Sequence, residues 1–82
     1  MLNVRVEIDS VRIQIAANNE LICRCNREVE RIVSKMELYN NVEYDEAYLP
    51  LLESTKERFL KLMQVDDILL RRYEELKRLE MR

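Results

Sequence analysis

The sequence contains no glycine, no histidine and no tryptophan, and it has only one proline. Without glycine, few positions favour the positive φ that tight hairpin turns, phosphate-binding loops and strained catalytic turns usually need. Without histidine, Cys23 and Cys25 lack the usual co-ligand for zinc and the commonest base for a thiol nucleophile. Two residues apart on a helix, they point away from each other, so we expect both to remain reduced. These absences predict long helices and argue against an enzyme, a metal site or a bound cofactor.

The charge pattern and the hydropathy exclude further classes of protein. The 82 residues are enough for one domain, residues 1–82, and carry a net charge of −2 with acids and bases interleaved. No basic face stands out, so we do not expect nucleic-acid binding. No apolar run approaches the roughly 20 residues that span a bilayer, and the N-terminus lacks the pattern of a signal peptide. We therefore expect a cytoplasmic protein without a membrane span, with export by a signal-independent secretion system left open.

The strongest positive feature is a 4-3 repeat that runs through the first half of the chain. Steps of four and three keep one narrow face of an α-helix against a partner helix. The repeat contains only one strongly polar residue, Asn18. Its members are Val4, Ile8, Val11, Ile15, Asn18, Ile22, Cys25, Val29, Ile32, Met36 and Tyr39. The pattern predicts a long amphipathic helix that packs along its whole length. A hairpin of two such helices would have no pocket for a small-molecule substrate unless subunits form one between them.

The beginning of this helix is ambiguous in the sequence. Apolar and polar residues alternate over residues 2–8, which is typical of an extended segment. Asp9 or Ser10 could then cap the helix, because either side chain can accept a hydrogen bond from the free amides of the first turn. We expect an extended lead followed by a helix over about residues 10–39.

One turn and a second helix account for the rest of the chain. The segment YNNVEYD breaks the repeat, and its Asn40 and Asn41 suit a helix C-cap or a left-handed turn. We expect the second helix over about residues 46–80, where Pro50 is tolerated near the first turn. Its core stripe comprises Leu52, Thr55, Phe59, Leu62, Asp66, Leu69, Tyr73 and Leu76. The predicted fold is therefore all-α, an antiparallel two-helix hairpin.

A polar layer is predicted where the two stripes meet. With a turn centred between residues 42 and 43, residues that face each other across the hairpin have numbers that sum to about 85. This rule sets Asn18 against Asp66 and Asp67, and a buried polar layer of this kind opposes slips of register. Two alternatives are that the layer lies at the solvent edge and specifies nothing, or that it binds a metal or a ligand. Two adjacent Asp and one Asn make a poor oxygen cage, so we favour the register role.

The second helix has more apolar surface than one partner helix can cover. We expect the surplus residues to bind a further helix, either in a homodimeric four-helix bundle or in a different helical protein. The alternative is a hairpin whose extra residues stay partly exposed. The candidate partner-binding residues are Leu49, Leu51, Leu60, Met63, Ile68 and Leu70.

Three tyrosines surround the predicted turn. Tyr39, Tyr44 and Tyr48 lie among acidic residues, and tyrosine offers a large contact area at a low entropy cost. They are candidates for a recognition surface at the hairpin tip. The alternative is that their rings close the end of the bundle.

The chain resembles a family of small helical hairpins. The lead LNVRVEID, one turn near the middle and a second helix ending in RRYEELKRL are similar to the Trp-X-Gly proteins of type VII secretion and their partners. The segment YNNVEYD stands in place of the family's Trp-X-Gly turn. Lys77 stands at the acidic position of the family's Tyr-x-x-x-Asp/Glu tail signal, four residues after Tyr73. The resemblance therefore implies a dimerising partner or accessory protein of a secreted effector, rather than an exported substrate.

Two other classes share this architecture. The chain also resembles the small helical-hairpin co-chaperones of type III secretion, and a structural coiled-coil adaptor of a phage or regulatory complex needs no family resemblance. In every case the expected function is non-catalytic and depends on binding another helical protein. We expect a chaperone-like, secretion-linked interaction module that forms a homodimer, binds a helical partner, or does both.

Overall fold

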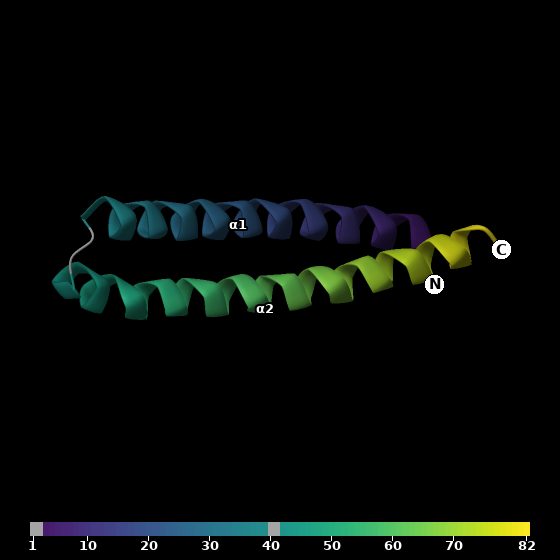
Figure 1. Cartoon of the computed structure of the whole chain (residues 1–82). Coiled ribbons are helices and arrows are strands. Elements are labelled where there is room, and N and C mark those ends of the chain that lie inside the picture. Colours follow the sequence, from purple (N-terminus) through teal and green to yellow (C-terminus); the bar gives the residue numbers. More distant parts are fainter. Residues whose placement is uncertain (1–2, 40–41) are drawn as a thin grey trace.

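The computed structural model describes residues 3–39 and 42–82, together with their side chains except that of Tyr44. Helices α1 (Val4–Tyr39) and α2 (Val42–Glu80) lie side by side and antiparallel, with both chain termini at the end opposite the turn (Figure 1). The prediction of an all-α two-helix hairpin is confirmed. Within the described ranges, neither helix has a stretch that is both long and apolar enough to cross a membrane. The predicted caps Asn40 and Asn41 lie outside these ranges.

Helix α1 begins earlier than the sequence suggested. It begins at Val4, so the predicted extended lead and the predicted cap at Asp9 or Ser10 are wrong. The cap is Asn3, whose side-chain Oδ1 accepts a hydrogen bond from the amide of Arg5 at 3.0 Å. The extra turns continue the 4-3 repeat and pack against the end of α2, and this packing outweighs the strand preference of the alternating residues.

Helix α2 also begins earlier, at Val42 instead of residue 46. Acidic Glu43 and Asp45 lie in its first turn, where negative charge interacts favourably with the helix dipole. Pro50 is consequently inside the helix and not near its first turn, so the expectation for this residue is wrong as well. Pro50 has no amide hydrogen and cannot donate to the carbonyl of Glu46, yet the helix continues through it.

The most tightly packed part of the core lies at the end that holds the termini. Ile8, Val11 and Leu76 are buried there, with Val4, Ile15, Leu69 and Tyr73 packed against them. Toward the turn, the buried residues are Asn18, Cys25 and Ile32 on α1 and Leu52 and Thr55 on α2. All of them belong to the two predicted stripes, so these stripes form the seam between the helices.

Contacts across the seam fix its register and distinguish its two sides. Arg5 forms an ion pair with Glu80 at 3.4 Å, and the guanidinium of Arg12 lies 6.0 Å from the ring centroid of Tyr73. Both pairs have numbers that sum to 85, as the pairing rule predicts; the next two pairs sum to 86 and 79. A different set of pairs, Arg58–Glu28 at 3.7 Å and Arg72–Glu7 at 3.3 Å, also bridges the helices. Heptad spacing places this second set on the other side of the seam.

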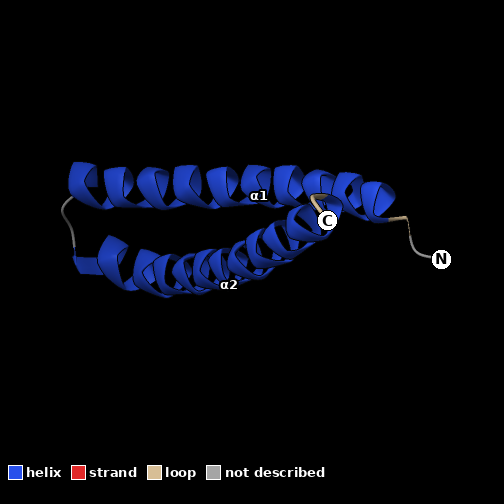
Figure 2. Cartoon of the chain, turned by 90° about the vertical axis from the view of Figure 1, so that its right-hand side faces the viewer, coloured by secondary structure: helices blue, strands red, loops and turns tan. Residues whose placement is uncertain are grey.

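The hairpin is long and thin. It measures 60 × 16 × 14 Å, and α2 curves along its length (Figure 2). Its radius of gyration is 18.4 Å, whereas a compact chain of this length would have about 12 Å. A structure only two helices wide buries one stripe of each helix and leaves the remaining faces exposed.

Candidate functional site

The hairpin exposes more surface than a compact protein of its mass. Its accessible surface is 6666 Å² for 10.0 kDa, against about 5,200 Å² for a typical folded monomer. Among the described residues, six hydrophobic side chains are buried and fifteen large ones are exposed. Single exposed apolar residues are ordinary, but an excess of this size marks a surface suited to association.

All six predicted partner-binding residues are exposed. Their exposed fractions run from 43% for Leu70 to 65% for Ile68. They do not form a single row, because a row on one helix face needs residues about seven apart and these six occupy several different heptad positions. The structure distributes them over both sides of the seam. Leu49, Met63 and Leu70 lie on the side of the Arg12–Tyr73 contact, and Leu60 lies on the same side but farther from the seam. Leu51 and Ile68 lie on the side of the Arg58–Glu28 pair.

We call these two surfaces the tyrosine side and the groove side of the seam. The tyrosine side carries Leu49, Met63 and Leu70 around the Arg12–Tyr73 contact. On the groove side, α1 and α2 line an open groove of about 460 Å³, within the range of roughly 300–1,000 Å³ that is typical of binding pockets. It is lined by Leu21, Arg24, Cys25 and Glu28 of α1 and by Arg58, Lys61, Leu62 and Val65 of α2.

The groove has an apolar floor and a charged rim. Cys25 is buried and Leu62 is half-buried at its base, while Leu21 and Val65 are exposed on opposite walls. These four side chains come from heptad positions in and next to the core stripe, so the groove is a direct extension of the seam. The arrangement offers hydrocarbon at the centre and charge at the edge, which is typical of a site that binds an amphipathic element.

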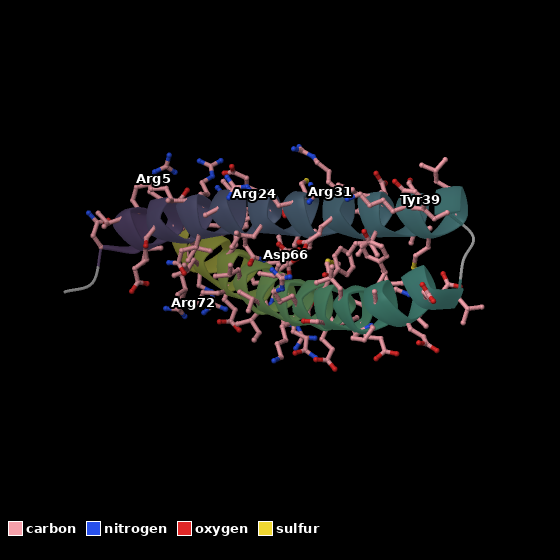
Figure 3. The ribbon with its side chains drawn as sticks, turned by 90° about the vertical axis from the view of Figure 1, so that its left-hand side faces the viewer. Arg5, Arg24, Arg31, Tyr39, Asp66 and Arg72 are labelled. Carbon is pink, nitrogen blue, oxygen red and sulfur yellow. The ribbon has the colours of Figure 1, made fainter. Side chains whose placement is uncertain are left out.

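A second hollow adjoins the groove along the outer surface of α1. It is shallow and has a volume of about 430 Å³. Its arginines add positive charge beside the apolar floor of the groove. Arg24 and Glu28 line both hollows, and Arg27 and Arg31 line only the second. Figure 3 shows Arg24 and Arg31 along the outer side of α1.

The two hollows together form a locally basic site that sequence reasoning missed. Their ten lining residues include five cations and one anion. The expectation that no basic face stands out is therefore wrong for this part of the surface. The available signal was the spacing of Arg24, Arg27 and Arg31, which places three arginines on neighbouring turns of one helix.

The predicted register layer is only partly assembled. Asn18 is 6% exposed, and its Nδ2 donates a hydrogen bond to the backbone carbonyl of Leu62 on α2 at 2.9 Å. Asp66 lies between the helices (Figure 3), and its Oδ1 is buried with no hydrogen-bond partner in the described part of the chain. Asp67 is exposed and forms an ion pair with Arg71 at 3.1 Å, so it does not belong to the layer.

The tyrosines near the turn are only partly described. Tyr39 is 50% exposed and Tyr48 is half-buried. Tyr39 lies at the end of α1 (Figure 3). Both make further interactions within the structure. The side chain of Tyr44 lies outside the described part of the chain. A recognition surface at this tip therefore stays a prediction.

The thiols and acids of the described residues form no metal centre. Cys23 is exposed, Cys25 is buried, and both are free thiols. The described side chains contain no group of three or more Cys, Asp or Glu that could hold a metal ion.

Comparison with known proteins gives no match to this chain, whether to family models, to curated proteins or to solved structures.

Proposed function

We propose that this protein is a non-catalytic interaction module that binds other helices to complete a helical bundle. The observation that carries the proposal is the number of large hydrophobic side chains that this two-helix hairpin leaves exposed, fifteen among the described residues. An interface of standard size covers about 800 Å² on each partner. The total accessible surface of this hairpin exceeds that of a compact monomer of its mass by roughly 1,400 Å². One such interface would cover little more than half of this difference.

The tyrosine side of the seam is suited to a second copy of the chain. Met63 and Leu70 lie one heptad apart there and are 44% and 43% exposed, which is the pattern of a flanking row in a four-helix bundle. Leu60 extends the apolar area behind them. Together with the resemblance to Trp-X-Gly proteins and their partners, this surface supports a chaperone-like accessory role in secretion, exercised in the cytoplasm.

The experiment measures the mass of the purified full-length chain from micromolar to millimolar concentration by sedimentation equilibrium, alone and after co-expression with the products of neighbouring genes. Met63→Lys combined with Leu70→Lys removes the apolar row, and Ser34→Lys combined with Gln64→Lys adds the same charge at exposed positions. We expect the wild type and the control to associate and the first double variant to dissociate. A wild-type chain that stays a lone monomer at millimolar concentration and forms no complex would contradict the proposal.

A further inference from the structure

We propose that the groove side binds an acidic amphipathic helix of a partner protein. This inference deepens the proposed function, on which it rests, by stating the chemistry of one partner. The groove offers a floor of Cys25 and Leu62 between the exposed walls Leu21 and Val65. Such a floor accepts the apolar stripe of a helix laid along the seam, as in other helix-in-groove complexes.

The length of the site matches a short helical segment. On α1 the lining residues run from Leu21 to Arg31, which corresponds to about 15 Å of helix rise. A bound helix lying parallel to the seam would contact this stretch over about three turns. Three turns present apolar residues at i, i+3 or i+4, and i+7, the usual anchors of this binding mode.

The charge of the rim selects the flanks of the bound helix. Arg24, Arg27, Arg31, Arg58 and Lys61 surround the site, and Glu28 is the one acidic lining residue. Arg58 is paired with Glu28 at 3.7 Å and Arg24 with Glu20 at 2.8 Å. Among the described residues, the other three cations form no ion pair, so glutamates or aspartates flanking the stripe of a bound helix would supply their counter-charges.

The same charges disfavour a second copy of this chain on the groove side. A twofold symmetric contact places the same patch of both subunits face to face. Here such a contact would bring five cations against five cations around a small apolar floor. Like-charge repulsion at an interface is costly, so the occupant is a different, acidic helix.

The test measures fluorescence anisotropy of two labelled peptides of about 14 residues, or four helical turns, binding to the full-length protein. Both peptides carry leucines at the same helical spacing, and the flanking positions are glutamate in one and lysine in the other. The groove variant combines Arg24→Glu with Lys61→Glu. The control combines Lys56→Glu with Arg78→Glu, which makes the same change in net charge at exposed positions away from the groove. Far-UV circular dichroism verifies that both variants remain helical.

We expect the acidic peptide to bind at least about tenfold more tightly than the basic peptide, because four or more exposed charge pairs change sign between them. The groove variant should lose about the same factor and the control less than about twofold, and added salt should weaken wild-type binding. Equal affinities for the two peptides, no binding of the acidic peptide at millimolar protein, or equal losses in both variants would overturn the inference. A labelled single-stranded RNA is measured in the same assay. If the protein binds this RNA but not the acidic peptide, the inference is overturned in favour of a nucleic-acid site.

The two proposals fail separately. If the wild-type chain associates in sedimentation but shows no preference for the acidic peptide, only the acidic-helix inference is wrong. If the wild type neither associates nor binds either peptide, both proposals are wrong.

Discussion

Replacing Asn18 by Leu should stabilise the hairpin while weakening its control of register. Asn18 is 6% exposed, and its single inter-helix hydrogen bond is donated to the Leu62 carbonyl at 2.9 Å. In a regular α-helix that carbonyl also accepts the amide of Asp66, so removal of the side-chain donor does not leave it unsatisfied. The substitution therefore removes one hydrogen bond without creating a new unpaired group.

The expected change in free energy follows from two opposing terms. Loss of a neutral hydrogen bond costs about 0.5–1.5 kcal/mol. Burial of a leucine side chain at a site already shielded from water contributes about 1.5–3 kcal/mol. The balance favours the Asn18→Leu variant by roughly 1 kcal/mol, reduced by any misfit of the new side chain. The specificity lost is that of the only buried polar residue of α1. Thr55 and Asp66 remain on the α2 stripe, but no polar residue of α1 then selects their position, so a slip of one heptad is opposed less strongly.

Urea denaturation followed by circular dichroism measures the stability, and cysteine cross-linking measures the register. In a chain with Cys23 and Cys25 replaced by Ala, cysteines at Glu28 and Arg58 report the native register, since these residues form an ion pair. Cysteines at Glu28 and Leu51 report a slip of one heptad. We expect the slipped pair to cross-link only in the Asn18→Leu variant. The reasoning is refuted if the variant is destabilised by more than about 1 kcal/mol, or if it keeps one oligomeric state and one set of cross-links.

Three further substitutions test the packing and the helix ends. Leu76→Ala should cost about 2–5 kcal/mol in urea denaturation, since Leu76 is 1% exposed, whereas Leu79→Ala at 51% exposure should cost less than about 1 kcal/mol; similar losses at both sites would contradict the assigned core. Asn3→Ala should lower the free energy of unfolding by about 0.5–2 kcal/mol and speed amide exchange in the first turn of α1, with Asn3→Ser retaining most of the stability. Pro50→Ala should stabilise the chain by up to about 3 kcal/mol, as measured by thermal melting, and a lower melting temperature would show that Pro50 is required where it is.

The architecture was predictable because the strongest signal in the sequence is also the largest energetic term. A seam of two helices needs a 4-3 repeat on each. Every buried residue of the described chain, from Ile8 on α1 to Leu76 on α2, belongs to one of these two repeats. The antiparallel pairing followed from one short turn, and the Arg5–Glu80 ion pair agrees with it. These features depend on periodicity and chain connectivity, which a sequence shows directly.

The helix beginnings were not predictable from local signals. Over residues 2–8 the strand-like alternation competes with the 4-3 repeat, and both fit Val4 and Ile8. The packing of Ile8 against Leu76 decides between them, and that contact joins residues from opposite ends of the chain. At α2, the predicted start at about residue 46 places Pro50 near the first turn, where proline is tolerated. The structure instead tolerates the loss of one backbone hydrogen bond at Pro50 inside a long helix.

The basic site escaped prediction because net charge averages over faces that a folded chain separates. The chain has 14 Lys and Arg and 16 Asp and Glu. The ten lining residues of the two hollows hold five of the cations and one acid, which leaves nine cations and fifteen acids on the rest of the chain. The lining residues therefore carry a formal charge of +4 and the rest of the chain −6, with one acid of that remainder, Glu20, paired to Arg24 at the rim. A distribution of this kind attracts an acidic helix to the groove and repels it from the other surfaces, so it directs the encounter as well as the binding. The weakly acidic net charge of the whole chain is thus compatible with our proposal that the two sides of one seam bind different partners.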